Sequence, residues 1–170
     1  LSKVIASALD VYPRFNSSLD KRTSEVVLKK YVNIGVAVDT PHGLLVPVIK
    51  NADQKNIVQI AADLTDLSSK ARDRKASMEA LTGATLDVSK VGSLGTPYVS
   101  PIVNWPQVAV IGVGRAEQQP VYVDGAFVPR LIMPLAVSYD HRVVDGADAA
   151  RFLHWIVEAL EQPMLLALEG

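Results

Sequence analysis

Apolar residues at helical spacing mark three segments of this chain as amphipathic helices. Near the start they recur every three or four positions until Pro13 ends the run. A second stripe, with polar residues on its opposite face, runs from Ile57 to Ala71. Ser77 is expected to cap a short further helix. Near the end, the same spacing predicts a helix with the buried stripe Ala150, Leu153, Ile156, Val157 and Leu160.

Runs of β-branched residues between these segments predict strands. The strands are expected over residues 26–28, 32–38, 44–49, 84–89, 107–113 and 131–139. Pro47 places its strand at a sheet edge or a bulge, because proline cannot donate to a strand ladder. Asp124 and Gly125 between two apolar runs predict a hairpin, and residues 92–101 predict a loop. Strands mixed with long helices predict an α/β fold, with helices packed on a mixed sheet.

Composition narrows the chemistry. The 170 residues fit one domain, and a hydrophobic content of 49% excludes a disordered chain. With 17 basic and 18 acidic residues and no basic run, the chain lacks the electrostatic footprint of a nucleic-acid-binding protein. The absence of cysteine excludes disulfides, thiolate–zinc sites and a cysteine nucleophile. No apolar stretch reaches the length of a membrane-spanning helix.

His141 is the strongest candidate for catalysis. It follows a predicted buried strand, and Asp145 and Gly146 come four and five positions later, where the last helix begins. Because imidazole titrates near neutral pH, a histidine at a strand exit beside acidic groups is a candidate general base. On an Asp-His-Arg triplet alone, a purely structural histidine is the commoner role. His42 lies in a turn and His154 on a polar helix face, so both are expected to be solvated.

Four segments together resemble a known family. They are, in chain order, Arg14 to Leu19, Asn33 to Ile49, Pro101 to Gly112 and Ser138 to Gly146. Their order and their spread along the chain resemble the catalytic domain of the dihydrolipoyl acyltransferases, the core enzymes of the 2-oxo-acid dehydrogenase complexes. The resemblance implies an open α/β sandwich like that of chloramphenicol acetyltransferase, assembled as homotrimers that build a larger core.

The resemblance implies transfer of an acyl group between the thiols of dihydrolipoamide and coenzyme A. Residues 92–98 and 101–104 resemble the acetyl- and branched-chain-transferring members more than the succinyl-transferring ones. Acetyl transfer, as in the pyruvate dehydrogenase type, is favoured, with branched-chain acyl transfer as the alternative. Coenzyme A would be a substrate, the lipoyl-lysine would come from a domain absent from this chain, and no metal is expected. His141 would take the proton of the attacking thiol, which is only mildly uphill from a thiol pKa of ~8.5 to an imidazole pKa of ~6.5.

Three further residues receive roles from the resemblance. Residues 83–92 resemble the family segment whose serine hydroxyl stabilises the oxyanion, and Ser89 stands at that position. On the residues alone, a serine that only lines a strand end is the preferred interpretation of Ser89. Asp145 is expected to cap the last helix and, by resemblance, to hold the loop that orients His141. Asn16 lies in a loop that resembles part of the substrate channel.

Four residues of the Ser89 segment depart from the family pattern, and two of them, Ala84 and Leu86, stand where members mostly carry glycine and phenylalanine. Asp87 stands where family members mostly carry threonine, and Lys90 replaces a small or amide residue. Asp87 and Lys90 both change the charge beside Ser89. The backbone and the charge of the pocket around Ser89 are therefore expected to differ from the family pattern. Arg142 is expected to be a structural ion-pair partner rather than a catalyst.

The resemblance also sets expectations for domains and partners. Residues 1–170 would be the acyltransferase catalytic domain without its N-terminal part, its lipoyl domain and its peripheral-subunit-binding domain. The decarboxylase and dihydrolipoyl dehydrogenase components would bind through those absent domains, and neither nucleic acid nor membrane is expected as a partner. The location would be the cytoplasm in a bacterium or the mitochondrial matrix in a eukaryote.

Two other functions compete with this interpretation. A coenzyme A-dependent acyltransferase acting on a small hydroxyl compound usually shows two adjacent histidines, whereas this chain shows Asp140 and His141. A non-catalytic scaffold subunit would have lost the base. The presence of His141, Asp145 and Ser89 favours an enzyme.

Overall fold

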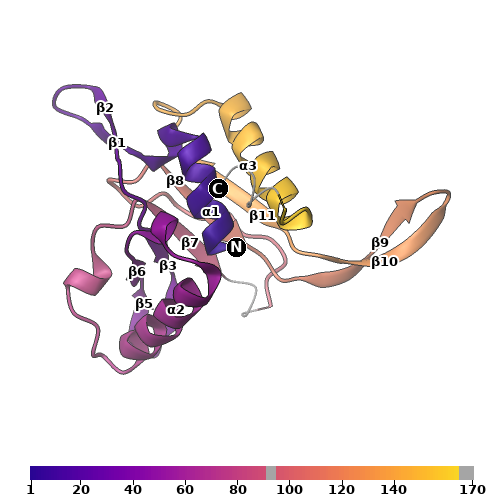
Figure 1. The fold of residues 1–170 in the computed structure, drawn as a ribbon, viewed down its shortest axis with the longest axis horizontal. Coiled ribbons are helices and arrows are strands. Elements are labelled where there is room, and N and C mark those ends of the chain that lie inside the picture. The colour runs from indigo at the N-terminus through magenta and orange to yellow at the C-terminus, as the bar shows by residue number, and fades with distance from the viewer. Residues whose placement is uncertain (91–94, 165–170) are drawn as a thin grey trace.

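A five-stranded mixed sheet lies at the centre of the molecule, and the computed structural model describes residues 1–90 and 95–164 around it (Figure 1). Its strands, in spatial order, are β11 (Leu135–Tyr139), β8 (Ala109–Val113), β7 (Leu86–Lys90), β3 (Ile34–Val36) and β6 (Val48–Ile49). Strands β3 and β8 run parallel to β7 between them. The outermost strands are antiparallel to their neighbours, β11 to β8 and β6 to β3. The predicted mixed sheet is therefore confirmed.

The described residues form three α-helices, which pack on this sheet. Helices α1 (Ser2–Val11) and α3 (Gly146–Glu161) lie side by side over one face, and α2 (Ile57–Arg72) packs near β4 and β6 (Figure 1). Short 3-10 helices cover Pro13–Asn16, Ala52–Gln54 and Glu79–Leu81. The last of these is the short helix predicted near Ser77, whose Oγ accepts a hydrogen bond from the Ala80 amide at 3.2 Å. None of the helices described is long and apolar enough to cross a membrane.

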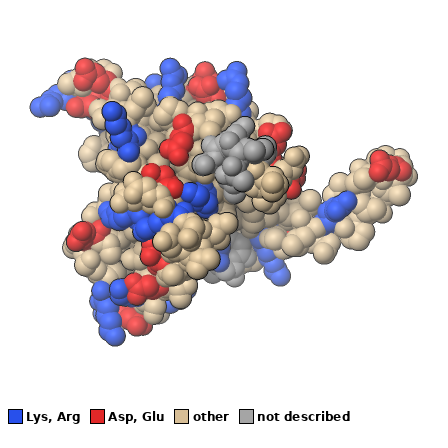
Figure 2. All heavy atoms as spheres, in the orientation of Figure 1, with Lys and Arg blue, Asp and Glu red and all other residues tan. Residues whose placement is uncertain are grey.

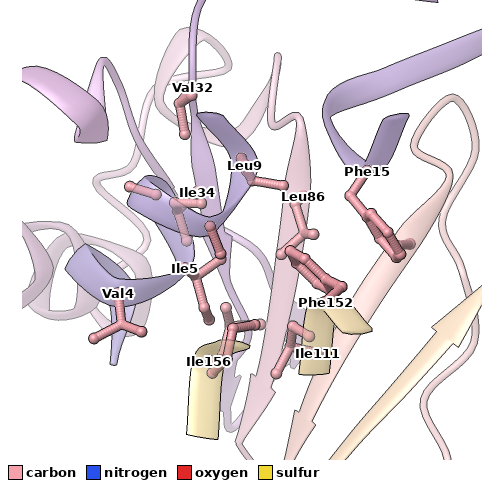
Figure 3. Close-up of a cluster of buried hydrophobic side chains, with 14 of the residues drawn as sticks. Val4, Ile5, Leu9, Phe15, Val32, Ile34, Leu86, Ile111, Phe152 and Ile156 are labelled. Atoms are coloured by element: carbon pink, nitrogen blue, oxygen red, sulfur yellow. The ribbon is translucent and has the colours of Figure 1, made fainter. Parts of the chain in front are cut away.

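The hydrophobic core lies between α1, α3 and the sheet. Phe15 and Phe152 stack with ring centroids 3.9 Å apart, and Leu86 and Ile111 rise from the central strands toward them (Figure 3). Burial of these side chains removes apolar surface from water at about 25 cal/mol per Å². The core thus holds β7, β8 and the start of α3 in fixed positions.

The predicted stripe on the last helix is confirmed at Ile156 and is otherwise displaced by one position. The residues that α3 buries are Ala149, Phe152, Ile156 and Ala159, while Leu153, Val157 and Leu160 are half-buried at the edge. The aromatic ring of Phe152 sets the helix rotation, because it fills the space beside Phe15. In α2 the structure likewise buries Ile60 and Ala71 and leaves Ile57 exposed.

Proline and hairpins interrupt several predicted strands. Residues 131–139 divide at Pro134 into the end of β10 (Ala126–Ile132) and β11, and residues 44–49 divide at Pro47 into β5 (Gly43–Leu45) and β6. The sheet edge predicted from Pro47 is confirmed, since β6 is the outermost strand on its side of the sheet. Residues 32–38 divide into β3 and β4 (Val38–Thr40), which pairs with β5.

Two further hairpins extend from the body. β1 (Ser17–Asp20) pairs with β2 (Glu25–Leu28), and β9 (Glu117–Val123) pairs with β10 in a long arm (Figure 1). Asp124 and Gly125 both adopt positive φ angles, of 50° and 86°, so the predicted two-residue turn is confirmed. Figure 2 shows acidic and basic side chains interspersed over the visible face of the body and few charges along the arm.

The loop predicted over residues 92–101 lies partly outside the described residues. From residue 95 onward it passes closely over the end of β8. A Cβ atom at Gly114 would lie 1.9 Å from the Pro97 carbonyl oxygen, and one at Gly112 would lie 2.6 Å from the Val99 side chain. The two glycines therefore let this loop lie directly on the sheet, next to Ser89.

Candidate active site

His141 lies in the turn between β11 and α3 (Figure 1). Asp140 holds this turn, because its amide donates to the Val108 carbonyl at 2.8 Å and its own carbonyl accepts from the Val143 and Val144 amides at 3.0 and 3.1 Å. The two valine side chains are buried in the core. The imidazole is exposed and lies 5.7 Å from the Tyr139 ring, centroid to centroid. A firmly anchored turn thus presents the imidazole to solvent.

Arg142 forms the ion pair that the sequence predicted. Its Nε lies 2.8 Å from Asp140 Oδ1, and the amide of Arg142 donates to the same oxygen at 3.1 Å. The hydrogen bonds and charge of Arg142 hold the pKa of the Asp140 carboxyl below its usual value. Asp140 is therefore ionised near neutral pH and is committed to the turn rather than to proton transfer.

Asp145 caps α3, as predicted. Its Oδ1 accepts a hydrogen bond from the Asp148 amide at 2.8 Å. The pKa of Asp145 is lowered mainly by that hydrogen bond, with smaller contributions from the Ala147 amide and from the charges of Arg151 and His141. Asp145 and His141 are thus close enough to interact electrostatically. The role of Asp145 in orienting His141 stays a prediction.

Ser89 lies at the other end of the sheet from His141 in the same chain. Across the strands, Ser89 aligns with Gly112, which aligns with Ala136 near the start of β11. His141 follows Ala136 by five residues, which at about 3.3 Å per residue is roughly 17 Å along the strand direction. A base and an oxyanion donor must both lie about 3 Å from one reacting group. One chain alone therefore does not form a site from these two residues.

The two unusual residues of β7 point to opposite faces of the sheet. Side chains alternate along a strand, so Asp87 shares the face of Ser89, whereas Lys90 shares the face of Val88. Lys90 is exposed and lines a cavity of about 380 Å³ with Arg72 of α2. Of these two charged departures from the family pattern, only Asp87 places a charge on the face that carries Ser89.

Asp87 is a buried carboxyl group with 7% of its surface exposed. Burial raises the pKa of Asp87, and side-chain hydrogen bonds with Gln107 and Asn104 oppose that rise. The sequence assigned no role to these two amides, although both stand in the family-like segment from Pro101 to Gly112. Their signal was missed because they lie in the segment before β8, and only the pairing of β8 with β7 brings that segment to Asp87.

The remaining candidates have structural partners. Asn16 is buried, and its Nδ2 donates to the Lys29 and Tyr31 carbonyls at 3.1 and 3.0 Å. These bonds tie the residue to the end of β2, and its place in a substrate channel stays a prediction. His42 and His154 are exposed, as predicted, with His154 Nε2 3.3 Å from Glu158 Oε1.

Comparison with known proteins matches residues 1–168 to the family described as 2-oxoacid dehydrogenases acyltransferase, catalytic domain. The dihydrolipoyllysine-residue acetyltransferase component of the pyruvate dehydrogenase complex of Pseudomonas aeruginosa is 49% identical over 168 residues, or 99% of this chain. The corresponding component of Haemophilus influenzae is 46% identical over 160 residues, or 94% of the chain. The chain spans 31% and 28% of the lengths of these two relatives.

Solved structures match the fold closely. A structure of Azotobacter vinelandii dihydrolipoamide acetyltransferase, studied for the role of a serine, a histidine and an asparagine in its mechanism, is 46% identical with a TM-score of 0.94. That match covers 98% of this chain and 68% of the other. A structure of the cubic core of the pyruvate dehydrogenase multienzyme complex is 47% identical with the same TM-score and the same coverage. Chloramphenicol acetyltransferase, 16% identical with a TM-score of 0.54 over 91% of this chain and 72% of its own, shares the fold alone.

Proposed function

This chain belongs to the 2-oxoacid dehydrogenase acyltransferases, whose catalytic domain it carries, and we propose that it transfers an acetyl group between dihydrolipoamide and coenzyme A. One observation carries the proposal. In the Azotobacter vinelandii enzyme the serine precedes the histidine by 52 positions and the asparagine follows it by four, and Ser89, His141 and Asp145 stand at the same two intervals. Asp145 differs from asparagine, but both side chains offer the oxygen that caps a helix.

The proposed reaction is a direct exchange between two thiols. His141 takes the proton of the attacking thiol while the sulfur bonds to the thioester carbonyl carbon. The Ser89 hydroxyl donates a hydrogen bond to the oxyanion of the tetrahedral intermediate, which is worth roughly 3 kcal/mol. The intermediate expels the other sulfur, and the imidazole returns the proton to that thiolate. Both thiols belong to substrates, so the mechanism requires no cysteine of the enzyme.

The separation of Ser89 and His141 supports a site shared between two copies of the chain. Since the two lie at opposite ends of the sheet in one chain, the His141 turn of one subunit would meet the Ser89 strand of its neighbour. A closed ring of identical subunits satisfies this requirement at every interface. We therefore propose a homotrimer as the active unit, which builds a larger core as in the related cubic assembly. Decarboxylase and dihydrolipoyl dehydrogenase components are the proposed partners.

Acyl-group preference tests the proposed function. Turnover with dihydrolipoamide is compared for acetyl-, isobutyryl- and succinyl-coenzyme A. We expect kcat/KM for acetyl transfer to exceed that for isobutyryl transfer about tenfold, because two added methyl groups must fit a packed pocket. A preference for isobutyryl-coenzyme A would identify a branched-chain acyltransferase. Loss of all three activities in a folded trimer would point to a scaffold subunit instead.

For turnover, the negative charge of Asp145 is expected to matter less than the hydrogen bond by which Asp145 caps α3. Asp145→Asn retains an oxygen that accepts from the Asp148 amide, so turnover should stay within about threefold of the parent. Asp145→Ala removes that oxygen, frees the first turn of α3 and should lower both turnover and melting temperature. Steady-state kinetics and thermal melts of the two variants check this order. An Asn variant as impaired as the Ala variant would instead assign the effect to the carboxylate charge.

A further inference from the structure

Tyr139 is the last residue of β11 and stands two positions before His141. Its side chain is half-buried and packs against the hydrophobic core, on the same face of the strand as Leu135 and Val137. The centroid of its ring lies 5.7 Å from the centroid of the His141 imidazole, and the two ring planes are inclined by 42°. Aromatic rings attract each other at separations of about 4.5–7 Å. Tyr139 thus connects the core to the candidate base.

The side chain of Tyr139 also reaches the start of α3. A Cβ atom at Gly146 would lie 3.6 Å from the Tyr139 hydroxyl oxygen, which is an ordinary van der Waals distance. Gly146 is the first residue of the helix, directly after the Asp145 cap. One side chain therefore contacts both the imidazole and the far end of the turn that carries it.

The imidazole of His141 has no hydrogen-bond partner among the residues that the structure describes. Its recorded interactions are the ring contact with Tyr139 and the electrostatic interaction with Asp145. A charge interaction depends little on the rotation of the imidazole, whereas contact with a second ring restricts that rotation. A general base must keep one nitrogen at the attacking thiol, so an imidazole that rotates freely is often in an unproductive rotamer.

We propose that Tyr139 is a positioning residue for the general base: its ring packs against the His141 imidazole and holds it in the rotamer that accepts the proton of the attacking thiol. The inference rests on the proposed function. The ring carries the effect, because the Tyr139 hydroxyl forms no hydrogen bond with a residue that the structure describes. Tyr139 itself moves no proton.

Two substitutions separate the ring of Tyr139 from its hydroxyl. Tyr139→Phe keeps the ring, so kcat for acetyl transfer should stay within about twofold of the parent. Tyr139→Leu keeps an apolar side chain but removes the ring. Its kcat should fall about fivefold to tenfold with both KM values within about twofold, because only the imidazole is misplaced. Parental kcat in a folded Leu variant would overturn the proposal.

Val137→Ala is the matched control for the loss of packing. Val137 is also half-buried on the core-facing side of β11, but it lies two residues before Tyr139 and makes no ring contact with His141. Val137→Ala should lower the melting temperature and leave kcat unchanged. Thermal melts verify that each variant folds, and Tyr139→Ile, with a side chain suited to strands, replaces Tyr139→Leu if the Leu variant does not fold.

A double-mutant cycle shows whether Tyr139 acts through the imidazole. In the His141→Ala background no imidazole is left to position, so adding Tyr139→Leu should change the residual turnover less than about twofold. An equal loss of turnover in both backgrounds would overturn the proposal, because Tyr139 would then stabilise the turn without acting on the base.

Chemical modification tests the ring contact without acetyl transfer. Diethyl pyrocarbonate acylates accessible imidazoles, and peptide mass spectrometry gives the rate at each histidine. The rate at His141 should rise about twofold in Tyr139→Leu, since part of the imidazole is uncovered, and stay parental in Tyr139→Phe. His154, on the outer face of α3, is the internal control. A rise at His141 in a protein that transfers no acetyl group would overturn the proposed function alone. An unchanged rate at His141 in the Leu variant would overturn the positioning role.

Discussion

Replacing His141 with alanine is expected to lower the turnover of acetyl transfer by roughly two to four powers of ten. The imidazole is the only group of its turn that the proposed mechanism uses to move a proton, and neither Asp140 nor Arg142 can replace it because they are committed to each other. The fold should survive, since the turn is held by backbone hydrogen bonds to Asp140 and by two buried valines.

His154→Ala is the matched control for His141→Ala. His154 is also exposed, and it pairs with Glu158 on the outer face of α3. Removing it should leave turnover unchanged. Steady-state kinetics with acetyl-coenzyme A and dihydrolipoamide, together with thermal melts, compare the two variants. Parental turnover in a folded His141→Ala protein would remove the general base from the mechanism.

The hydrophobic pattern predicted the elements of this fold better than their limits. Helical periodicity located α1, α2 and α3, and the Asp124-Gly125 pair located the hairpin turn, because these signals are local. The stripe on α3 was displaced by one position except at Ile156, since the packing of Phe152 against Phe15 decides the helix rotation. The strand predicted over residues 131–139 broke at Pro134, where the β9–β10 arm leaves the body.

In the candidate site, too, the sequence predicted the local features and missed those that depend on tertiary packing. A short motif located His141 and Asp145, because the two residues are four positions apart, in the turn after β11 and at the N-cap of α3. The cavity around Asp87, which Gln107 and Lys29 also line, could not be predicted, since these two residues reach it from loop segments that are distant in the sequence. Periodicity does show that Asp87 and Ser89 share a face, but it carries no information on what covers that face.

Replacing Ser89 with alanine is expected to lower turnover by about 10² to 10³, the usual cost of losing one oxyanion donor. A shared site makes a stronger prediction for mixtures. Ser89→Ala and His141→Ala trimers are each nearly inactive, but exchange of their subunits pairs an intact serine with an intact histidine at some interfaces. Equal amounts should restore about one quarter of the parental activity, because each residue is intact with even odds at each symmetric interface.

A second mixture controls for incomplete exchange and for a site within one chain. The parent is mixed with the double variant Ser89→Ala/His141→Ala, and subunits are exchanged as before. If each site needs two subunits, the activity of the parent should fall to about half, since a parental subunit then often faces a double variant. If Ser89 and His141 acted within one chain, exchange would change nothing in this mixture and would restore nothing in the first. Native mass spectrometry verifies that mixed trimers form, so that persistent inactivity of the first mixture would exclude the shared site.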